Sequence, residues 1–182
     1  MYIKDIILKS CDFIGKSELG QNLENGSLTE EEQCEIDGLV KSFNLIVEEI
    51  ASQYQPIMQT EKFIVKNFKL EFSTFSKPVC EIYSIKDKFG RNVNYKIFDG
   101  YIFVCGKEVD VIYSTYPQTL SLEDEIDFKL PERIFAYGVA REYFFANNLY
   151  EDANMWEERF KGALSIMLRR KSEVRMPRRR WI

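Results

Sequence analysis

The spacing of apolar residues changes twice along the chain, from helical to strand-like and back again. The first stretch predicts a helix over residues 2–14, because its large apolar side chains fall on one face at intervals of three and four. These are Ile3, Ile6, Ile7, Cys11 and Ile14. Gly15, Gly20 and Gly26 then predict a connection through residues 15–26.

A second helix is predicted from Thr29 to the residues before Pro56. Thr29 and Glu32 have the spacing of a capping box, in which each side chain accepts a hydrogen bond from the other residue's backbone amide. A regular apolar stripe follows, made of Ile36, Leu39, Val40, Phe43, Val47, Ile50 and Tyr54. Pro56 lacks an amide hydrogen and should end the helix.

The apolar residues next alternate with a period of two, which is typical of strands. The predicted strands lie around 63–65, 68–72, 79–83, 93–97, 101–105 and 109–113. Asp99-Gly100 is a signal for a two-residue type I′ hairpin turn. We therefore expect residues 61–116 to form an antiparallel meander or open barrel of five or six strands.

The helical period returns after Pro117. Leu130-Pro131 predicts a helix start with proline at the first helical position, and Asn147-Asn148 separates that helix from a last one beginning near Glu151. So short a break predicts an antiparallel helical hairpin. The expected fold is α+β, a mainly helical bundle of two N-terminal helices and the C-terminal hairpin with an antiparallel β module inserted between them.

This order predicts a helical domain of residues 1–60 and 117–171, an inserted β module of residues 61–116, and a basic C-terminal arm of residues 172–182. The last fourteen residues hold seven Lys or Arg and one Glu, whereas the whole chain has a net charge of −4. The body is therefore acidic and the arm basic. Such an arm is typical of a segment that contacts another macromolecule.

The composition favours a binding or structural role over catalysis. The chain has no histidine, which excludes catalysis by Ser-His-Asp or Cys-His arrangements. Cys11, Cys34, Cys80 and Cys105 lack metal-ligand spacing, so we expect four free thiols, buried or half-buried. We expect no catalytic residue, cofactor or metal ion.

Two other clusters have ordinary explanations. The acids of Glu123, Asp124, Glu125 and Asp127 could hold Mg²⁺ or Ca²⁺, but the glycine and terminal glutamate of a calcium loop are missing. Aromatic residues of the β module could stack on nucleobases, but no dense basic pattern accompanies them. These are Phe68, Phe72, Phe75, Tyr83, Tyr95 and Tyr101. We expect a solvated acidic loop and a mixture of core and exposed aromatics.

The C-terminal third carries one family likeness. Its residues are Leu130-Pro131-Glu132, the segments 136–143 and 151–160, Ala163-Leu164 and the basic run Arg169-Arg170-Lys171. This pattern resembles the head-to-tail connector proteins of tailed phages, also called adaptor or tail tubular proteins. The N-terminal helices and the inserted β module match that family's layout only loosely.

The resemblance implies a structural virion protein and not an enzyme. It implies a homo-oligomeric ring, usually of twelve subunits, that links the portal protein to tail proteins and lets double-stranded DNA pass without sequence-specific binding. An acidic channel would keep the phosphates from sticking. No apolar run is long enough for a membrane span, so we expect the protein to stay in a cytoplasm or in something assembled there. The resemblance implies assembly in the host cytoplasm and location in the virion.

Two residue sets follow as expected contact sites. The aromatic residues of the helical hairpin exceed what one helix pair can bury, which predicts the subunit interface at Tyr143, Phe144, Phe145 and Tyr150. Trp156 belongs to the same surplus, with a place in the core as the alternative. The resemblance implies that the C-terminal segment reaches the portal, and its arginines and tryptophan are of the types favoured as anchors in protein interfaces. The expected portal-docking residues are Arg169, Arg170, Lys171, Arg175, Arg178, Arg179, Arg180 and Trp181.

The competing interpretation is a nucleic-acid-binding regulator, with the arginine-rich arm on phosphate and the hairpin as a helix-turn-helix. The helices over residues 131–170 show no basic recognition face before Arg169, and the acidic body would repel a duplex. A steep salt dependence of DNA affinity would favour the regulator.

Overall fold

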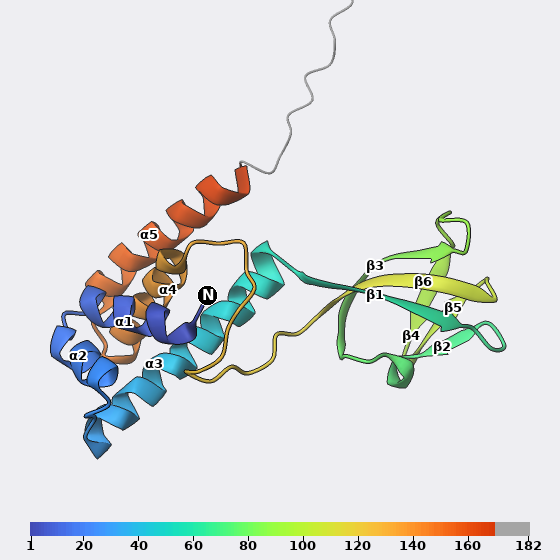
Figure 1. Cartoon of the computed structure of the whole chain (residues 1–182). Helices are drawn as coiled ribbons and strands as arrows, with labels where there is room; N and C mark the ends of the chain where they lie inside the picture. Colours follow the sequence, from blue (N-terminus) through green and yellow to red (C-terminus); the bar gives the residue numbers. More distant parts are fainter. Residues whose placement is uncertain (170–182) are drawn as a thin grey trace, which may run out of the picture. The chain divides into compact units, whose positions relative to one another are not determined.

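The computed structural model describes residues 1–169, which form two compact units (Figure 1). The helical unit joins Met1–Val47 to the chain that resumes at Thr119, and the β unit is Glu48–Gln118. The part of the chain that the structure describes has five α-helices and two small antiparallel sheets. The fold is α+β, and this prediction is confirmed.

The helical unit contains α1 (Ile3–Phe13), α2 (Ser17–Asn25), α3 (Glu30–Glu49), α4 (Glu132–Ala146) and α5 (Tyr150–Arg169). Helix α4 packs against both α1 and α5, so the last two helices form the expected hairpin. The apolar stripes of the sequence become the core. Fully buried side chains include Ile3, Ile6, Ile7, Ile36, Phe43, Ile46, Phe135, Val139, Phe160 and Leu164.

Helix α3 begins with the predicted capping box. The Thr29 amide donates to a carboxylate oxygen of Glu32 at 2.8 Å, and the Glu32 amide donates to the Thr29 hydroxyl at 3.3 Å. The helix runs to Glu49 and continues as a π-helical turn over Ile50–Tyr54 before Pro56. This start and this end are confirmed.

Helix α2 occupies the segment that the sequence predicted to be a connection, so that prediction was wrong. Leu19 and Leu23 are buried in it, and Gly26 ends it in the left-handed region with φ +68°. Gly20 is a packing residue and not a break. A Cβ there would lie 3.4 Å from the Cβ of Cys11, so the glycine lets α1 and α2 approach closely.

The β unit holds β1 (Ile57–Ile64), β2 (Lys69–Glu71), β3 (Val79–Asp87), β4 (Tyr95–Phe98), β5 (Tyr101–Val104) and β6 (Glu108–Thr115). The first strand begins before residue 61, where the β module was expected to start. One sheet has the order β1-β6-β3 and the other β2-β5-β4. Both sheets line one core, which contains Leu70, Phe75, Ile85, Ile102, Val111 and Tyr113.

The strands do not follow one another as a meander, so that one of the two expected arrangements is wrong. The last strand, β6, lies between β1 and β3. It is the most buried strand, with Val109, Val111 and Tyr113 almost inaccessible, as expected for a central strand of apolar residues. A central strand is covered on both edges, so its backbone groups are paired on both sides.

The β4–β5 hairpin lies where Asp99-Gly100 predicted it, with Phe98 paired to Tyr101. Its turn is not type I′, because only Gly100 has a positive φ, of +81°, whereas type I′ needs two. The two-residue turn with both angles positive is Asn67-Phe68, at +52° and +59°. Lys69 closes it by donating its amide to the Lys66 carbonyl at 2.9 Å.

The segment that follows the β unit is fixed to the helical unit by Asn44 of α3. The Asn44 side chain donates to the Leu120 carbonyl at 2.9 Å and accepts the Leu120 amide at 2.8 Å. Further along, the Ile3 amide donates to the Asp124 carbonyl at 3.1 Å. No helix within residues 1–169 is both long and apolar enough to span a membrane.

Candidate functional site

An exposed apolar surface surrounds the turn between α4 and α5. We call it the hairpin patch and define it as Tyr143, Phe144, Phe145, Leu149 and Tyr150. Phe145, Leu149 and Tyr150 are exposed, whereas Tyr143 and Phe144 are half-buried. The structure thus brings together the four residues predicted to form the subunit interface. That role itself stays a prediction.

Local contacts hold the hairpin patch in place. Asn148 turns the chain with φ +61°, and its side-chain oxygen accepts the Tyr150 hydroxyl at 2.9 Å. The rings of Phe145 and Tyr150 lie 6.2 Å apart, and those of Tyr143 and Phe144 meet edge to face at 5.6 Å. A surface ordered in this way loses little side-chain freedom on contact with a partner.

Beside the hairpin patch lies a groove of about 650 Å³ between α3 and the end of α4. We call it the acidic groove. One wall carries Glu31, Glu32 and Glu35, together with the exposed Cys34. Apolar lining comes from Leu39, Tyr143 and Ala146. Tyr143 belongs to both surfaces, so the groove and the hairpin patch are continuous.

Lys16 contacts both α3 and α4, the two helices that line the acidic groove. Its ammonium group pairs with Glu35 and lies 5.5 Å from the centre of the Tyr143 ring. Burial opposes the charged form of Lys16, but hydrogen bonds to Glu35 and Tyr143 outweigh it and raise the pKa of the amine. Glu32 is engaged as the helix cap, and its hydrogen bonds with the Thr29 backbone and with Asn22 lower the pKa of that carboxyl.

Arg141 fixes the geometry of the hairpin beneath the patch. It is buried, pairs with Glu142 on α4 and Glu157 on α5, and lies 5.1 Å from the centre of the Phe160 ring. Sequence reasoning missed this role, because Arg141 and Glu157 lie on different helices. The sequence signal for the acidic groove was present only as the acids next to the predicted cap of α3.

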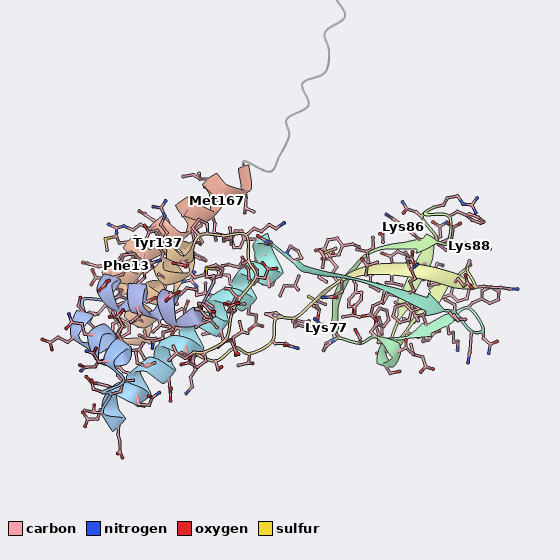
Figure 2. The ribbon with its side chains drawn as sticks, in the orientation of Figure 1. Phe13, Lys77, Lys86, Lys88, Tyr137 and Met167 are labelled. Atoms are coloured by element: carbon pink, nitrogen blue, oxygen red, sulfur yellow. The ribbon has the colours of Figure 1, made fainter. Side chains whose placement is uncertain are left out.

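Trp156 is a core residue and does not contribute to the hairpin patch. Its ring stacks at 5.1 Å on Phe13 and lies 5.5 Å from Tyr137; Figure 2 labels these two neighbours. Arg159 covers the indole at 4.7 Å. Loss of the ring would therefore act on folding first.

The predicted portal-docking residues lie almost wholly outside the described part of the chain. Arg169 is the last residue of α5. The other members lie beyond residue 169. These are Arg170, Lys171, Arg175, Arg178, Arg179, Arg180 and Trp181. Their assignment stays a prediction.

The net negative charge of residues 1–169 comes from the helical unit. Residues 1–47 and 119–169 contain ten Lys and Arg against nineteen Asp and Glu, whereas residues 48–118 contain nine of each. From the sequence alone, the body is a single acidic part. The two units instead differ by nine charges, so they present different surfaces to an anionic or cationic partner.

The acidic cluster and the cysteines that the sequence singled out form no candidate metal site within residues 1–169. Asp124 accepts hydrogen bonds from the backbone amide and hydroxyl of Ser121, which lower the pKa of its carboxyl. No group of three or more metal-ligating side chains is found within residues 1–169. Burial raises the pKa of Cys11 to about 11, whereas Cys34, Cys80 and Cys105 are exposed. The expectation of buried or half-buried thiols was wrong for these three.

The aromatic residues of the β unit divide as the sequence suggested, into core and surface. Phe75 is buried, and Phe72 packs against the same core. Phe68 and Tyr83 are exposed.

Comparison with known proteins adds no family: no protein-family model matches the chain, and a search of curated proteins finds no match.

Proposed function

We propose that the protein is a structural virion component, a connector subunit that forms a ring between the portal and the tail of a phage. The observation that carries this proposal is the hairpin patch. The rings of Phe145 and Tyr150 are exposed 6.2 Å apart at a fixed turn, beside the exposed Leu149, and apolar side chains that gather on a surface in this way mark protein contacts. The likeness of the C-terminal third to connector proteins supports the same role.

The charge distribution supports a DNA-conducting ring. A helical unit with nineteen acidic and ten basic residues repels phosphate, so a channel built from its surface would let duplex DNA slide through. Sequence-specific DNA contact is not part of the proposal. In this role the protein works by assembly and not by catalysis.

The arm supplies the proposed link to the portal. Its arginines and Trp181 are of the types that anchor interfaces. Tail proteins would bind the ring on its other side. The proposed place of the protein is therefore the virion, with a ring of twelve subunits as the resemblance implies.

Light scattering and electron microscopy of the purified protein, alone and mixed with its portal protein, test the proposal. The expected result is a closed ring, formed alone or on the portal. Phe145→Asp with Tyr150→Asp should remove ring formation and leave the circular dichroism spectrum unchanged, because both side chains are exposed. Phe98→Asp, at an exposed aromatic of the β unit, is the matched control.

Three outcomes would contradict the proposal or part of it. A protein that forms no ring under either condition is not a connector subunit. Rings that survive the double substitution would show that the hairpin patch is not the contact. Tight DNA binding that weakens steeply with salt would favour the nucleic-acid-binding regulator instead.

A further inference from the structure

The β unit has one end at which exposed apolar side chains and cations gather. The chain enters and leaves the unit beside the Ile57–Thr115 pair, whereas the Ile64–Glu108 pair marks the opposite end. We call this opposite end the distal tip. It contains Ile64, Phe68 and Phe89, which are 76%, 57% and 69% exposed. Large apolar side chains this exposed, gathered at one end, indicate a contact surface.

Cations surround these three side chains. Lys66, Lys86, Lys88, Arg91 and Lys107 lie on the strands and turns of the tip, against Asp87, Glu108 and Asp110. Figure 2 shows Lys86 and Lys88 at one end of the β unit and Lys77 at the other. Lys88 and Arg91 each lie 5.1 Å from the centre of the Phe89 ring. Phe89 is therefore an apolar side chain flanked by two positive charges.

The turn that carries Phe89 is built by Asp87. One carboxylate oxygen accepts the amides of Phe89 at 2.8 Å and Arg91 at 2.9 Å, and the other pairs with the Arg91 guanidinium at 2.8 Å. Gly90 supplies the left-handed residue with φ +78°. The Phe89 ring is thus presented on a pre-organised turn, which reduces the entropy lost on binding.

The nearby Asn67-Phe68 turn has a backbone conformation that a bulky residue rarely adopts. Phe68 has φ +59°, and its ring lies 6.0 Å from Phe103. Conformations of this kind cost free energy and are found at contact sites more often than elsewhere. Two separate turns therefore hold aromatic rings outward at the same end.

We propose that the distal tip of one copy docks into the acidic groove of a second copy. The two surfaces are complementary in charge and in chemistry. Lys88 would face Glu31, since Arg91 and Glu35 are already paired with Asp87 and Lys16. The Phe89 ring would rest on the apolar lining at Tyr143 and Ala146. This inference rests on the proposed function and names the contact that joins the subunits of the ring.

The proposed contact is heterologous, because two different surfaces of the same chain meet. Contacts of this type propagate from copy to copy and close into a ring when the rotation permits. The groove is continuous with the hairpin patch through Tyr143, so both belong to one receiving surface. The distal tip of the neighbouring copy supplies the surface that binds to this receiving surface.

A cysteine trap tests the contact with the full-length chain. Cys34 lines the groove and is exposed, so it supplies one thiol. The background carries Cys80→Ser and Cys105→Ser, which removes the other exposed thiols. Lys88→Cys places the second thiol at the tip and retains Phe89 and Arg91. Lys77→Cys, at the other end of the unit, is the matched control.

Mild oxidation of the Lys88→Cys protein should give disulfide-linked dimers and higher species on a non-reducing gel. Peptide mapping should identify the bond from Cys34 of one copy to the introduced cysteine at position 88 of another. The expected yield exceeds that of the Lys77→Cys control by at least about tenfold, the ratio that corresponds to 1.4 kcal/mol. Equal yields, or no linked species, would overturn the inference.

Charge reversal gives a second readout. Lys88→Glu and Glu31→Lys should each raise the protein concentration needed for half-maximal assembly, by about tenfold. The chain that carries both substitutions should recover assembly, because the opposite charges face each other again. A double variant no better than the single variants would overturn the pairing.

The outcomes separate this inference from the proposed function. If rings assemble but oxidation of the Lys88→Cys protein gives no disulfide bond to Cys34, the tip contact is refuted and the connector function stands. A linked pair in a protein that never closes a ring would support the contact and refute the connector. Salt-dependent DNA binding that Lys88→Glu abolishes, without any cross-link, would assign the tip to nucleic acid and overturn the inference.

Discussion

Two glycines in helices of the helical unit occupy opposite surroundings. A Cβ at Gly138 of α4 would lie 2.8 Å from Cγ2 of Ile46, a fully buried side chain of α3. A Cβ at Gly162 of α5 would meet nothing within 4 Å. Gly138 is therefore required for the close approach of α3 and α4, whereas Gly162 is not required by packing.

Gly138→Ala should lower the free energy of unfolding. Overpacking of a core costs about 1–3 kcal/mol, which exceeds the gain of about 1 kcal/mol that alanine brings to a helix. Gly162→Ala should instead stabilise the protein by up to about 1 kcal/mol. Urea unfolding of both variants checks the pair, and equal effects would contradict the packing argument.

Glu157 links the buried Arg141 to the pH dependence of stability. Burial opposes ionisation of its carboxyl, but hydrogen bonds from Lys161 and Arg141 outweigh it, and the pKa lies below its ordinary value of 4.5. A carboxyl with a lowered pKa stabilises the fold above the pKa of the unfolded chain. That stabilisation is lost as the pH falls through the pKa of the folded state.

Glu157→Gln should therefore weaken the dependence of unfolding free energy on pH in the range from about pH 5 down to about pH 3. Its stability near neutral pH should be lower than that of the wild type, because Arg141 stays buried with one carboxylate fewer. Glu158→Gln, at an exposed neighbour on α5, is the control. An unchanged pH slope for Glu157→Gln would refute this account of the ion pair.

At the scale of elements, the sequence predicted those features of helices and strands that depend only on residues close together in the chain. The Thr29 capping box, the proline that ends α3 and the strand alternation depend on neighbouring residues, and the structure contains them. The order of the strands was not predictable in this way. The central place of β6 depends on how Val109, Val111 and Tyr113 fill a core shared by two sheets.

The same distinction applies to the candidate site. The surplus of aromatic residues in the hairpin was visible in sequence, and it located Phe145 and Tyr150 correctly at the surface. The acidic groove was not visible, because Glu31 and Tyr143 lie far apart in the chain and meet only in the folded helical unit. Helix α2 was missed because Gly20 was interpreted as a break.

Thr29→Ala tests the element whose start the sequence specified best. Loss of the side-chain cap should lower the free energy of unfolding by about 1 kcal/mol. The acidic groove should be affected too, since Thr29, Glu31 and Glu32 line it. Thr29→Ser, which retains the hydroxyl, should restore stability in urea unfolding; failure to do so would contradict the capping role.

At the scale of the whole molecule, the arm and the body should act separately. A chain that ends at Lys171 retains α1 to α5 and the β unit, so its thermal unfolding should match that of the full chain. It should bind the portal more weakly, because Arg175, Arg178, Arg179, Arg180 and Trp181 are removed. Pull-down of the portal by both chains measures this. Equal binding would refute the docking role of the arm.

The insertion of the β unit has a consequence for folding during synthesis. The unit is one contiguous segment, whereas the helical unit needs residues on both sides of it. The ribosome therefore completes the β unit first, at a stage when the apolar faces of α1 and α3 are still exposed because α4 has not been synthesised. Once folded, the β unit holds Ile57 and Thr115 about 5 Å apart as strand partners. The folded β unit thus removes most of the conformational freedom of the long segment between α3 and α4. The entropy lost when α4 packs against α3 is then close to that for a short connection.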